Sequence, residues 1–183
     1  MPTVLLPLAP GFEELEAITI VDLLRRAGIS VTIAGLVPGP VQGSHRTMIT
    51  PDATLDAELN RDYDMLVLPG GEPGSTRLQN DPRIATLIQK MGHAGKRLAA
   101  VCAAPRALAA AGVLDDRRAT CFPGAIDPAI YPRVQLTELA VVTDRNITTG
   151  RGPGTAMDFA LELIELLVGK EKRDDVEQRL LRS

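Results

Sequence analysis

The residue best suited to chemistry is Cys102, because it stands where an apolar strand turns into a helix. Residues 97–101 read as a buried strand, and Pro105 opens a helix predicted to end at residue 111. A strand that ends at a nucleophile and turns directly into a helix has the geometry of a nucleophile elbow. There the helix dipole and free N–H groups favour the thiolate, so we predict a reactive cysteine with a lowered pKa. The alternative is a buried, inert cysteine, since free cysteines are commonly buried.

A carboxyl group that could exchange a proton with this thiol stands in the first turn of an earlier helix. Glu13, Glu14 and Glu16 open a helix predicted over residues 14–27. Three acids at a helix start are also explained simply by the helix dipole. Glu16 is the better candidate for catalysis, because the residues one and two turns later are apolar. We therefore expect its side chain to point inward.

A pair of glycines offers backbone N–H groups to the same region. Gly70 and Gly71 follow the apolar strand predicted over residues 64–68. Glycines there let the backbone approach a ligand closely, so an N–H of this pair could contribute to an oxyanion hole. The alternative is a plain turn. The run Gly-Gly-Glu-Pro-Gly lacks the glycine spacing of a dinucleotide-binding loop.

The remaining candidate residues give weaker signals. His45 falls in a predicted hairpin and His93 near the end of an exposed helix, so we interpret both as surface histidines. No CxxC or HExxH spacing occurs, so we expect no metal site. Cys121 is a candidate resolving thiol, with a buried structural cysteine as the alternative.

These residues are positioned by alternating strands and helices. Strands are predicted over residues 3–9, 30–35, 64–68, 97–101, 139–143 and 147–149, and helices over 14–27, 82–94, 105–111, 153–168 and 170–181, with a small hairpin over 38–51. Continuous apolar strands between helices predict an α/β sandwich with a mostly parallel sheet. Ligands of such sheets bind beyond the carboxyl ends of the strands, where the loops 10–14, 70–75 and 102–105 converge.

Composition limits the class of protein. The 183 residues suit one domain over 1–183, and a net charge of −3 argues against a nucleic-acid binder with a basic face. Aromatic residues make up 3% of the chain, too few for base-stacking platforms. No apolar run is long enough to cross a membrane. Two cysteines cannot form a disulfide framework, so we expect a reducing, cytoplasmic compartment.

Four motifs occur in a fixed order along the chain: LAPGFEELEA at 8–17, VLPGG at 67–71, AAVCAAP at 99–105 and GRGPGT at 150–155. Together they resemble the ThiJ/PfpI superfamily, in the branch of the parkinsonism-associated protein deglycase, with most similarity to its bacterial members. The resemblance extends from the first strand to residue 172. It implies a flavodoxin-like fold, a homodimer and no cofactor.

The resemblance also implies roles for particular residues. The reactive cysteine falls on Cys102, its protonated glutamate partner on Glu16, and the oxyanion site on the amides of Gly71 and Ala103, beside Gly70. Glu13 and Arg26 are candidate pocket or anion-binding residues. The family's second arginine aligns with His45, next to Arg46.

Two departures from the family pattern bear on the chemistry. Many relatives have a histidine near the cysteine, whereas this chain has Phe122, as do the bacterial members of its branch. The protease-like branch has a histidine directly after the cysteine, where this chain has Ala103. Peptide hydrolysis is therefore not expected, and general-base catalysis by an imidazole is in doubt.

Three hypotheses for function follow. In the first, Cys102 attacks methylglyoxal, glyoxal, or their early glycation adducts on proteins and nucleotides, as a deglycase or glyoxalase that protects against carbonyl stress. In the second, the same thiolate is oxidised, and the protein is an oxidative-stress sensor or redox-regulated chaperone. In the third, the motifs only build the fold. The expected partners are a second copy of the chain and a small aldehyde or glycated substrate, with no membrane and no sequence-specific nucleic acid.

Overall fold

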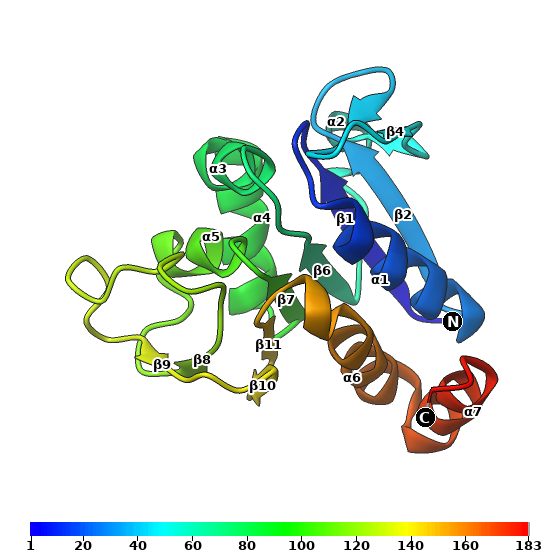
Figure 1. Cartoon of the computed structure of the whole chain (residues 1–183). Helices are drawn as coiled ribbons and strands as arrows, with labels where there is room; N and C mark the ends of the chain where they lie inside the picture. Colours follow the sequence, from blue (N-terminus) through cyan, green and yellow to red (C-terminus); the bar gives the residue numbers. More distant parts are fainter. Residues whose placement is uncertain (183) are drawn as a thin grey trace.

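A seven-stranded sheet forms the centre of the computed structural model, which describes residues 1–182 (Figure 1). Its strands are β1 (Thr3–Leu8), β2 (Ser30–Gly35), β5 (Ala53–Thr54), β6 (Met65–Leu68), β7 (Arg97–Val101), β10 (Val141–Asp144) and β11 (Ile147–Gly150). They stand in the order β10-β11-β7-β6-β1-β2-β5, and every neighbouring pair is parallel except β10 with β11. The predicted mostly parallel sheet is confirmed.

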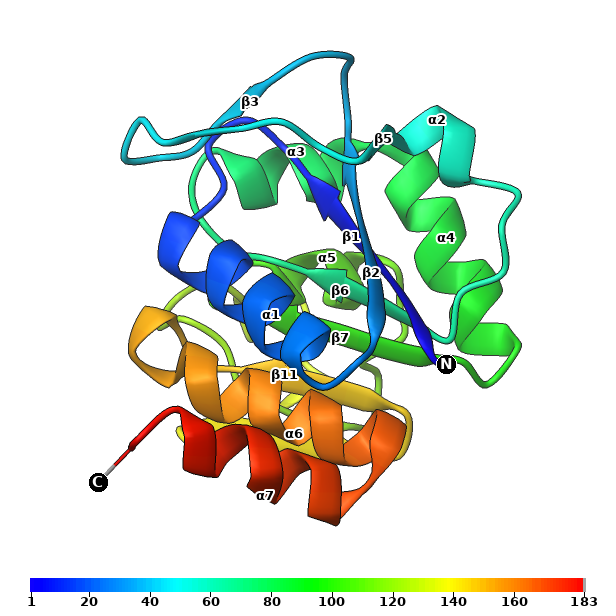
Figure 2. The ribbon, with the colours of Figure 1, turned by 90° about the vertical axis from the view of Figure 1, so that its right-hand side faces the viewer.

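Helices cover both faces of this sheet. They are α1 (Glu14–Arg26), α2 (Leu55–Glu58), α3 (Gly74–Asn80), α4 (Pro82–His93), α5 (Pro105–Ala110), α6 (Ala156–Val168) and α7 (Lys170–Arg179). Figure 2 shows α1 and α6 side by side over one face, with α7 packed against α6, while α3, α4 and α5 lie on the other face. The predicted flavodoxin-like sandwich is thus confirmed. No helix within residues 1–182 is long and apolar enough to span a bilayer.

The apolar strands divide their side chains between the two helical layers. On β1, Val4, Leu6 and Leu8 join the core beneath α1 and α6, whereas Leu5 joins the core beneath α4 and α5. Successive residues of a strand point to opposite faces, so a strand covered on both sides must be apolar throughout. This explains why the central strands appear in the sequence as unbroken apolar runs.

Two small sheets lie outside the central one. The strands β3 (Val41–Gln42) and β4 (Met48–Ile49) pair antiparallel, which confirms the predicted hairpin. The strands β8 (Arg118–Ala119) and β9 (Gln135–Leu136) form a parallel pair that the sequence did not predict. Each of these strands has two residues, too few for a pattern of alternating polarity to be recognised.

Most predicted elements occur within one or two residues of their expected bounds, and the differences are local. Residues 70–75 were predicted as a loop, but α3 begins inside this range at Gly74. The helix predicted from residue 153 begins with a 3-10 turn, η1 (Pro153–Thr155), and becomes α-helical at Ala156. The second residue of this turn is Gly154, and glycine has a low helix propensity, which disfavours an α-helix at this point.

The ends of β11 and β7, beside Cys102, pack against the aromatic ring of Phe159. This side chain of α6 is fully buried, and a methyl group built on Gly150 would lie 2.9 Å from its ring and 2.9 Å from Val101. Glycine at position 150 therefore lets α6 pack directly on β11. The position of Cys102, which follows Val101, depends on this contact.

Phe159→Ala is expected to lower the free energy of unfolding by about 3–5 kcal/mol, the usual range for deleting a buried phenylalanine. Urea denaturation followed by circular dichroism measures the change. The matched control is Met157→Ala on the same helix, because Met157 is 43% exposed and leaves no cavity. Equal effects of the two substitutions would contradict a packing role for the ring.

Candidate active site

Cys102 occupies a strained turn at the carboxyl end of β7. Its φ of 62° lies in the left-handed region, which residues other than glycine rarely adopt. The turn is fixed on both sides: the Cys102 N–H donates to the Gly150 carbonyl at 3.0 Å, and the Phe122 N–H donates to the Cys102 carbonyl at 2.7 Å. The side chain is directed into a nearly closed site, with 8% of the residue exposed. This is the strand-to-helix turn that the sequence predicted.

Glu16 lies inside this site and is completely buried. Its Oε2 accepts the Gly70 N–H at 2.8 Å. Its Oε1 is buried and has no partner of good hydrogen-bond geometry within residues 1–182, although the thiol of Cys102 lies near enough to perturb the pKa of the carboxyl group. Burial raises the pKa of Glu16 to about 7, against the lowering effects of the Cys102 thiol and the Gly70 amide. The structure confirms the predicted inward orientation of Glu16.

Gly70 allows the carboxyl group and the cysteine to approach each other. A methyl group at Gly70 would lie 2.5 Å from Oε2 of Glu16 and 2.6 Å from Cβ of Cys102. Both distances are far below van der Waals contact, so no larger residue fits without displacing the two side chains. Gly70 is therefore a spacer as well as a hydrogen-bond donor.

Two backbone amides face the sulfur atom. The N–H groups of Ala103 and Gly71 both act on Cys102 as hydrogen-bond donors that lower its pKa. Gly71 has φ +94°, and a methyl group there would lie 2.3 Å from the backbone nitrogen of Glu13. Only glycine can adopt this conformation so close to the start of α1. The structure thus brings together Cys102, Glu16, Gly70, Gly71 and Ala103.

The predicted lowering of the Cys102 pKa is wrong as a net effect. Burial, and after it the negative charge of Glu16, raise the pKa of Cys102 to about 12, and the two amides oppose this only in part. The two groups form a coupled pair, in which the charge of one raises the pKa of the other. A protonated Glu16 removes that repulsion, so the thiolate is favoured when the carboxyl group holds the proton.

The other acids of the first turn have different contacts. Oε2 of Glu13 accepts the Glu16 N–H at 2.7 Å, which makes Glu13 the N-cap of α1. Glu14, whose role the sequence did not reveal, accepts the His45 N–H at 2.6 Å and the Ser44 hydroxyl at 3.1 Å. Burial opposes its ionisation, but hydrogen bonds from the backbone of Glu14, His45 and Thr47 and from the His45 side chain outweigh burial and lower the pKa of Glu14. The contacts of Glu14 therefore attach the hairpin to α1.

His45 itself is a surface residue, as predicted, with its side chain 76% exposed. Glu13, Glu14 and His45 each place one ligand-type atom within 4.8 Å of the others. Because the carboxylates already accept N–H and O–H donors, the observed contacts of this cluster are structural.

Arg26 and Phe122 are placed differently from each other. Arg26 pairs with Asp22 at 2.7 Å in the last turn of α1, about 15 Å along the helix from Glu16, so it does not join the site within this chain. Phe122 lies beside the cysteine turn, because its backbone N–H donates to the Cys102 carbonyl, and the residue is 50% exposed. Cys121 beside it is buried and free, and burial raises its pKa.

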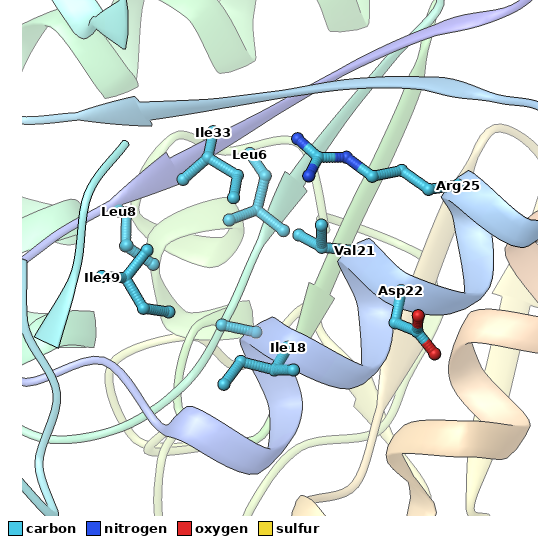
Figure 3. A pocket seen from close by; sticks show the side chains of 9 residues that line it. Leu6, Leu8, Ile18, Val21, Asp22, Arg25, Ile33 and Ile49 are labelled. Carbon is cyan, nitrogen blue, oxygen red and sulfur yellow. The ribbon is translucent and has the colours of Figure 1, made fainter. Parts of the chain in front are cut away.

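A separate apolar cavity of about 210 Å³ lies between α1, β1, β2 and β4 (Figure 3). Ile18, Val21 and Arg25 line it from α1, and Ile49 closes it from the hairpin. The nearby side chains of Leu15, Ile18 and Met48 are about half exposed, at 54%, 48% and 56%. We call this cavity and the exposed apolar side chains of α1 and β4 the α1 face.

Comparison with known proteins identifies the family. The DJ-1/PfpI family model matches residues 2–166. The chain is 41% identical over 175 residues to Protein dj-1beta of Drosophila melanogaster, covering 95% of this chain and 94% of the relative. It is 40% identical over 177 residues to the Parkinson disease protein 7 homolog of Danio rerio, with the same coverage. The chain belongs to the DJ-1/PfpI family.

Further relatives bear on activity and fold. The glutathione-independent glyoxalase DJR-1.2 of Caenorhabditis elegans is 34% identical over 164 residues, 90% of this chain and 87% of the relative. The crystal structure of Drosophila melanogaster DJ-1beta superposes with a TM-score of 0.94 at 40% identity, over 100% of this chain and 98% of that one. Toxoplasma gondii DJ-1, in an oxidized form, superposes with a TM-score of 0.93 at 32% identity, over 100% of both chains.

The raised pKa of Glu16 predicts a pH-dependent stability. In the unfolded chain this carboxyl group ionises near its ordinary value of 4.5, whereas in the folded protein it keeps its proton to about pH 7. The folded state therefore binds more protons between these values, and stability falls as pH rises through this window. Glu16→Gln removes the titration but keeps an acceptor for Gly70. We expect its melting temperature to exceed that of the wild type more at pH 8 than at pH 5. The same difference at both values would show that Glu16 is ionised throughout.

Proposed function

We propose that this protein is a cofactor-independent cysteine enzyme that converts reactive dicarbonyls, such as methylglyoxal, to hydroxy acids. The observation that carries the proposal is the buried Glu16 carboxyl group beside the Cys102 thiol, with the Gly71 and Ala103 amides directed at the sulfur. The name of the glyoxalase relative supports this class of reaction. The nearly closed site, with Cys102 only 8% exposed, favours small substrates.

The proposed reaction begins with addition of sulfur to the substrate. The Cys102 thiolate forms a C–S bond to the aldehyde carbon, and the Gly71 and Ala103 amides stabilise the oxyanion. Glu16 gives its proton to this oxygen, which completes a hemithioacetal. The Glu16 carboxylate then removes the proton from the former aldehyde carbon, and the hydroxyl group on that carbon passes its proton to the ketone oxygen, which gives the enediol in its deprotonated form.

Collapse of the enediol regenerates the enzyme. Glu16 returns its proton to the former ketone carbon, which leaves a lactoyl thioester on Cys102. Water hydrolyses the thioester to lactate and frees the thiol. The overall reaction adds one water to methylglyoxal and uses no oxidant or reductant. With a glycated side chain, the Cys102 thiolate would displace the amine or thiol from the adduct carbon, and Glu16 would give its proton to the departing group. This would leave the same hemithioacetal and would make the protein a deglycase.

The first experiment measures lactate formation from methylglyoxal by the wild type, Cys102→Ser and Glu16→Gln, with metals chelated. We expect no activity in Cys102→Ser and a loss of about 10²–10⁴-fold in Glu16→Gln, the usual contribution of a general acid–base. Cys121→Ser, which changes the other free cysteine, is the control and should keep most of the activity. Absence of lactate with the reduced wild type would reject the dicarbonyl reaction.

Oxidation of Cys102 is the second candidate function. A neutral Glu16 could donate its proton to an oxygen on the sulfur, and the oxidized Toxoplasma structure supports a stable oxidised form of this fold. Peroxide would oxidise the thiolate to a sulfenate, then a sulfinate, and would itself be reduced to water. Mass spectrometry after peroxide treatment tests this function. It requires that Cys102 is oxidised before Cys121. We place either function in the cytoplasm, where both cysteines would stay free.

We also propose that two copies of the chain associate through the α1 face. Exposed apolar surface of this kind marks interaction sites, and one face used twice gives a closed dimer. Ile18→Asp places a charge in the centre of this surface and should convert a dimer to a monomer in light scattering. Leu139→Asp is the matched control, because Leu139 is 52% exposed away from α1. A monomeric wild type, or a dimeric Ile18→Asp, would contradict the proposal.

A further inference from the structure

The two amides directed at Cys102 come from different parts of the chain. The Gly71 N–H lies in the loop between β6 and α3, and the Ala103 N–H lies in the turn between β7 and α5. An oxyanion hole stabilises charge only when both donors are held at the correct distance from one oxygen atom. The loop and the turn must therefore be fixed relative to each other.

A side-chain bridge connects these two parts directly beside the site. Glu72, the residue after Gly71, receives a hydrogen bond from the Arg106 guanidinium on α5. The same Nη2 donates to Oγ1 of Thr76 on α3 at 2.5 Å, and that hydroxyl donates to Oε2 of Glu72 at 2.8 Å. The three side chains form a closed ring of contacts that joins the glycine loop, α3 and α5.

The bridge is more constrained than an ordinary surface ion pair. The Arg106 side chain is 21% exposed, and its Nε is buried without a partner among the described residues. A planar guanidinium that reaches two partners at once is held in one orientation, which a flexible ammonium does not achieve. The charges of Arg106 and Glu72 are not among the causes of the Cys102 pKa shift, so the bridge affects the site through geometry.

The other hydrogen bonds of the loop are made with α1 and α3 rather than with α5. The Glu13 N–H donates to the Gly70 carbonyl at 2.9 Å, and the Ser75 N–H donates to the Gly71 carbonyl at 2.7 Å. These bonds attach the loop to the start of α1 and to α3. The hydrogen bonds of Arg106 complete the attachment on the side of the cysteine turn.

We propose that Arg106 is a positioning residue, which through Glu72 and Thr76 holds the Gly71 amide in register with the Ala103 amide for oxyanion binding. This inference rests on the proposed function, because it assumes that the two amides receive an oxyanion. Arg106 touches neither Cys102 nor Glu16 through any hydrogen bond of the described residues. Its effect should therefore be larger on reactions that form an oxyanion than on reactions that need only the thiolate.

The test compares Arg106→Met with the wild type in reactions that do and do not need the oxyanion hole. We expect lactate formation from methylglyoxal to fall at least about tenfold, because misplacing a group by about 1 Å can cost 10²-fold. Alkylation of Cys102 by iodoacetamide needs a thiolate but no oxyanion hole, so its rate should fall less than turnover does. Its pH midpoint should rise, because the displaced Gly71 amide lowers the Cys102 pKa in the wild type. Hydrogen exchange at the Glu13 and Ser75 amides should accelerate.

Further variants separate positioning from general loss of structure. Arg106→Lys should recover part of the turnover, because an ammonium can still pair with Glu72. The double variant Arg106→Met, Glu72→Gln should have the same turnover as Arg106→Met alone, since the two residues act as one unit. Arg179→Met removes the guanidinium that pairs with Asp175 on α7 and should leave all three measurements unchanged.

Each outcome decides between the alternatives. Turnover of Arg106→Met within about twofold of the wild type would overturn the inference, as would a parallel fall in turnover, alkylation and melting temperature. A wild type that forms no lactate would reject the proposed function instead. In that case hydrogen exchange at the Glu13 and Ser75 amides still decides whether Arg106 holds the loop, and unchanged exchange in Arg106→Met would overturn the inference.

Discussion

The site depends on the burial of one carboxyl group against one thiol. Glu16 is completely buried and Cys102 nearly so. Burial raises the pKa of both groups, and the negative charge of Glu16 raises the pKa of Cys102 further. The pair therefore resists carrying two negative charges, and the thiolate can hold the single charge only while Glu16 keeps its proton. The amides of Gly70, Gly71 and Ala103 stabilise that one charge. A nucleophile and a proton donor can thus coexist without a metal or an imidazole among them.

This arrangement places strict demands on the backbone. Three loops, after β1, β6 and β7, meet at the carboxyl edge of the parallel sheet, and Cys102 adopts a left-handed φ where they meet. Side chains at Gly70 or Gly71 would collide with Glu16, Cys102 or the start of α1. The packed core on both faces of the sheet stabilises the strain in this turn, as strain at functional sites generally requires.

The sequence predicted the parts of the molecule that follow from local pattern. Unbroken apolar runs predicted the central strands, and the apolar positions after Glu16 predicted its inward orientation. The helix α3 was missed, because its sequence GSTRLQN buries a single apolar side chain, Leu78, and so carries no helical periodicity. The direction of the Cys102 pKa was also missed, since position suggests stabilising amides but only coordinates show how much water is excluded. The contacts of Glu14 could not be predicted, because they are made with a hairpin that is distant in sequence.

The family resemblance implies that Phe122 stands where many relatives have a histidine, which raises the question of what transfers protons at neutral pH. An unperturbed carboxyl group titrates near pH 4, too low to hold a proton in a cell, whereas imidazole titrates near 6.5. Burial shifts the pKa of Glu16 to about 7, into the range that histidine ordinarily occupies. Phe122, whose backbone N–H donates to the Cys102 carbonyl, has a side chain without a charge or hydrogen-bonding group that could compete with this pair. Glu16 can therefore both give and accept a proton at neutral pH, which are the two roles that an imidazole would otherwise fill.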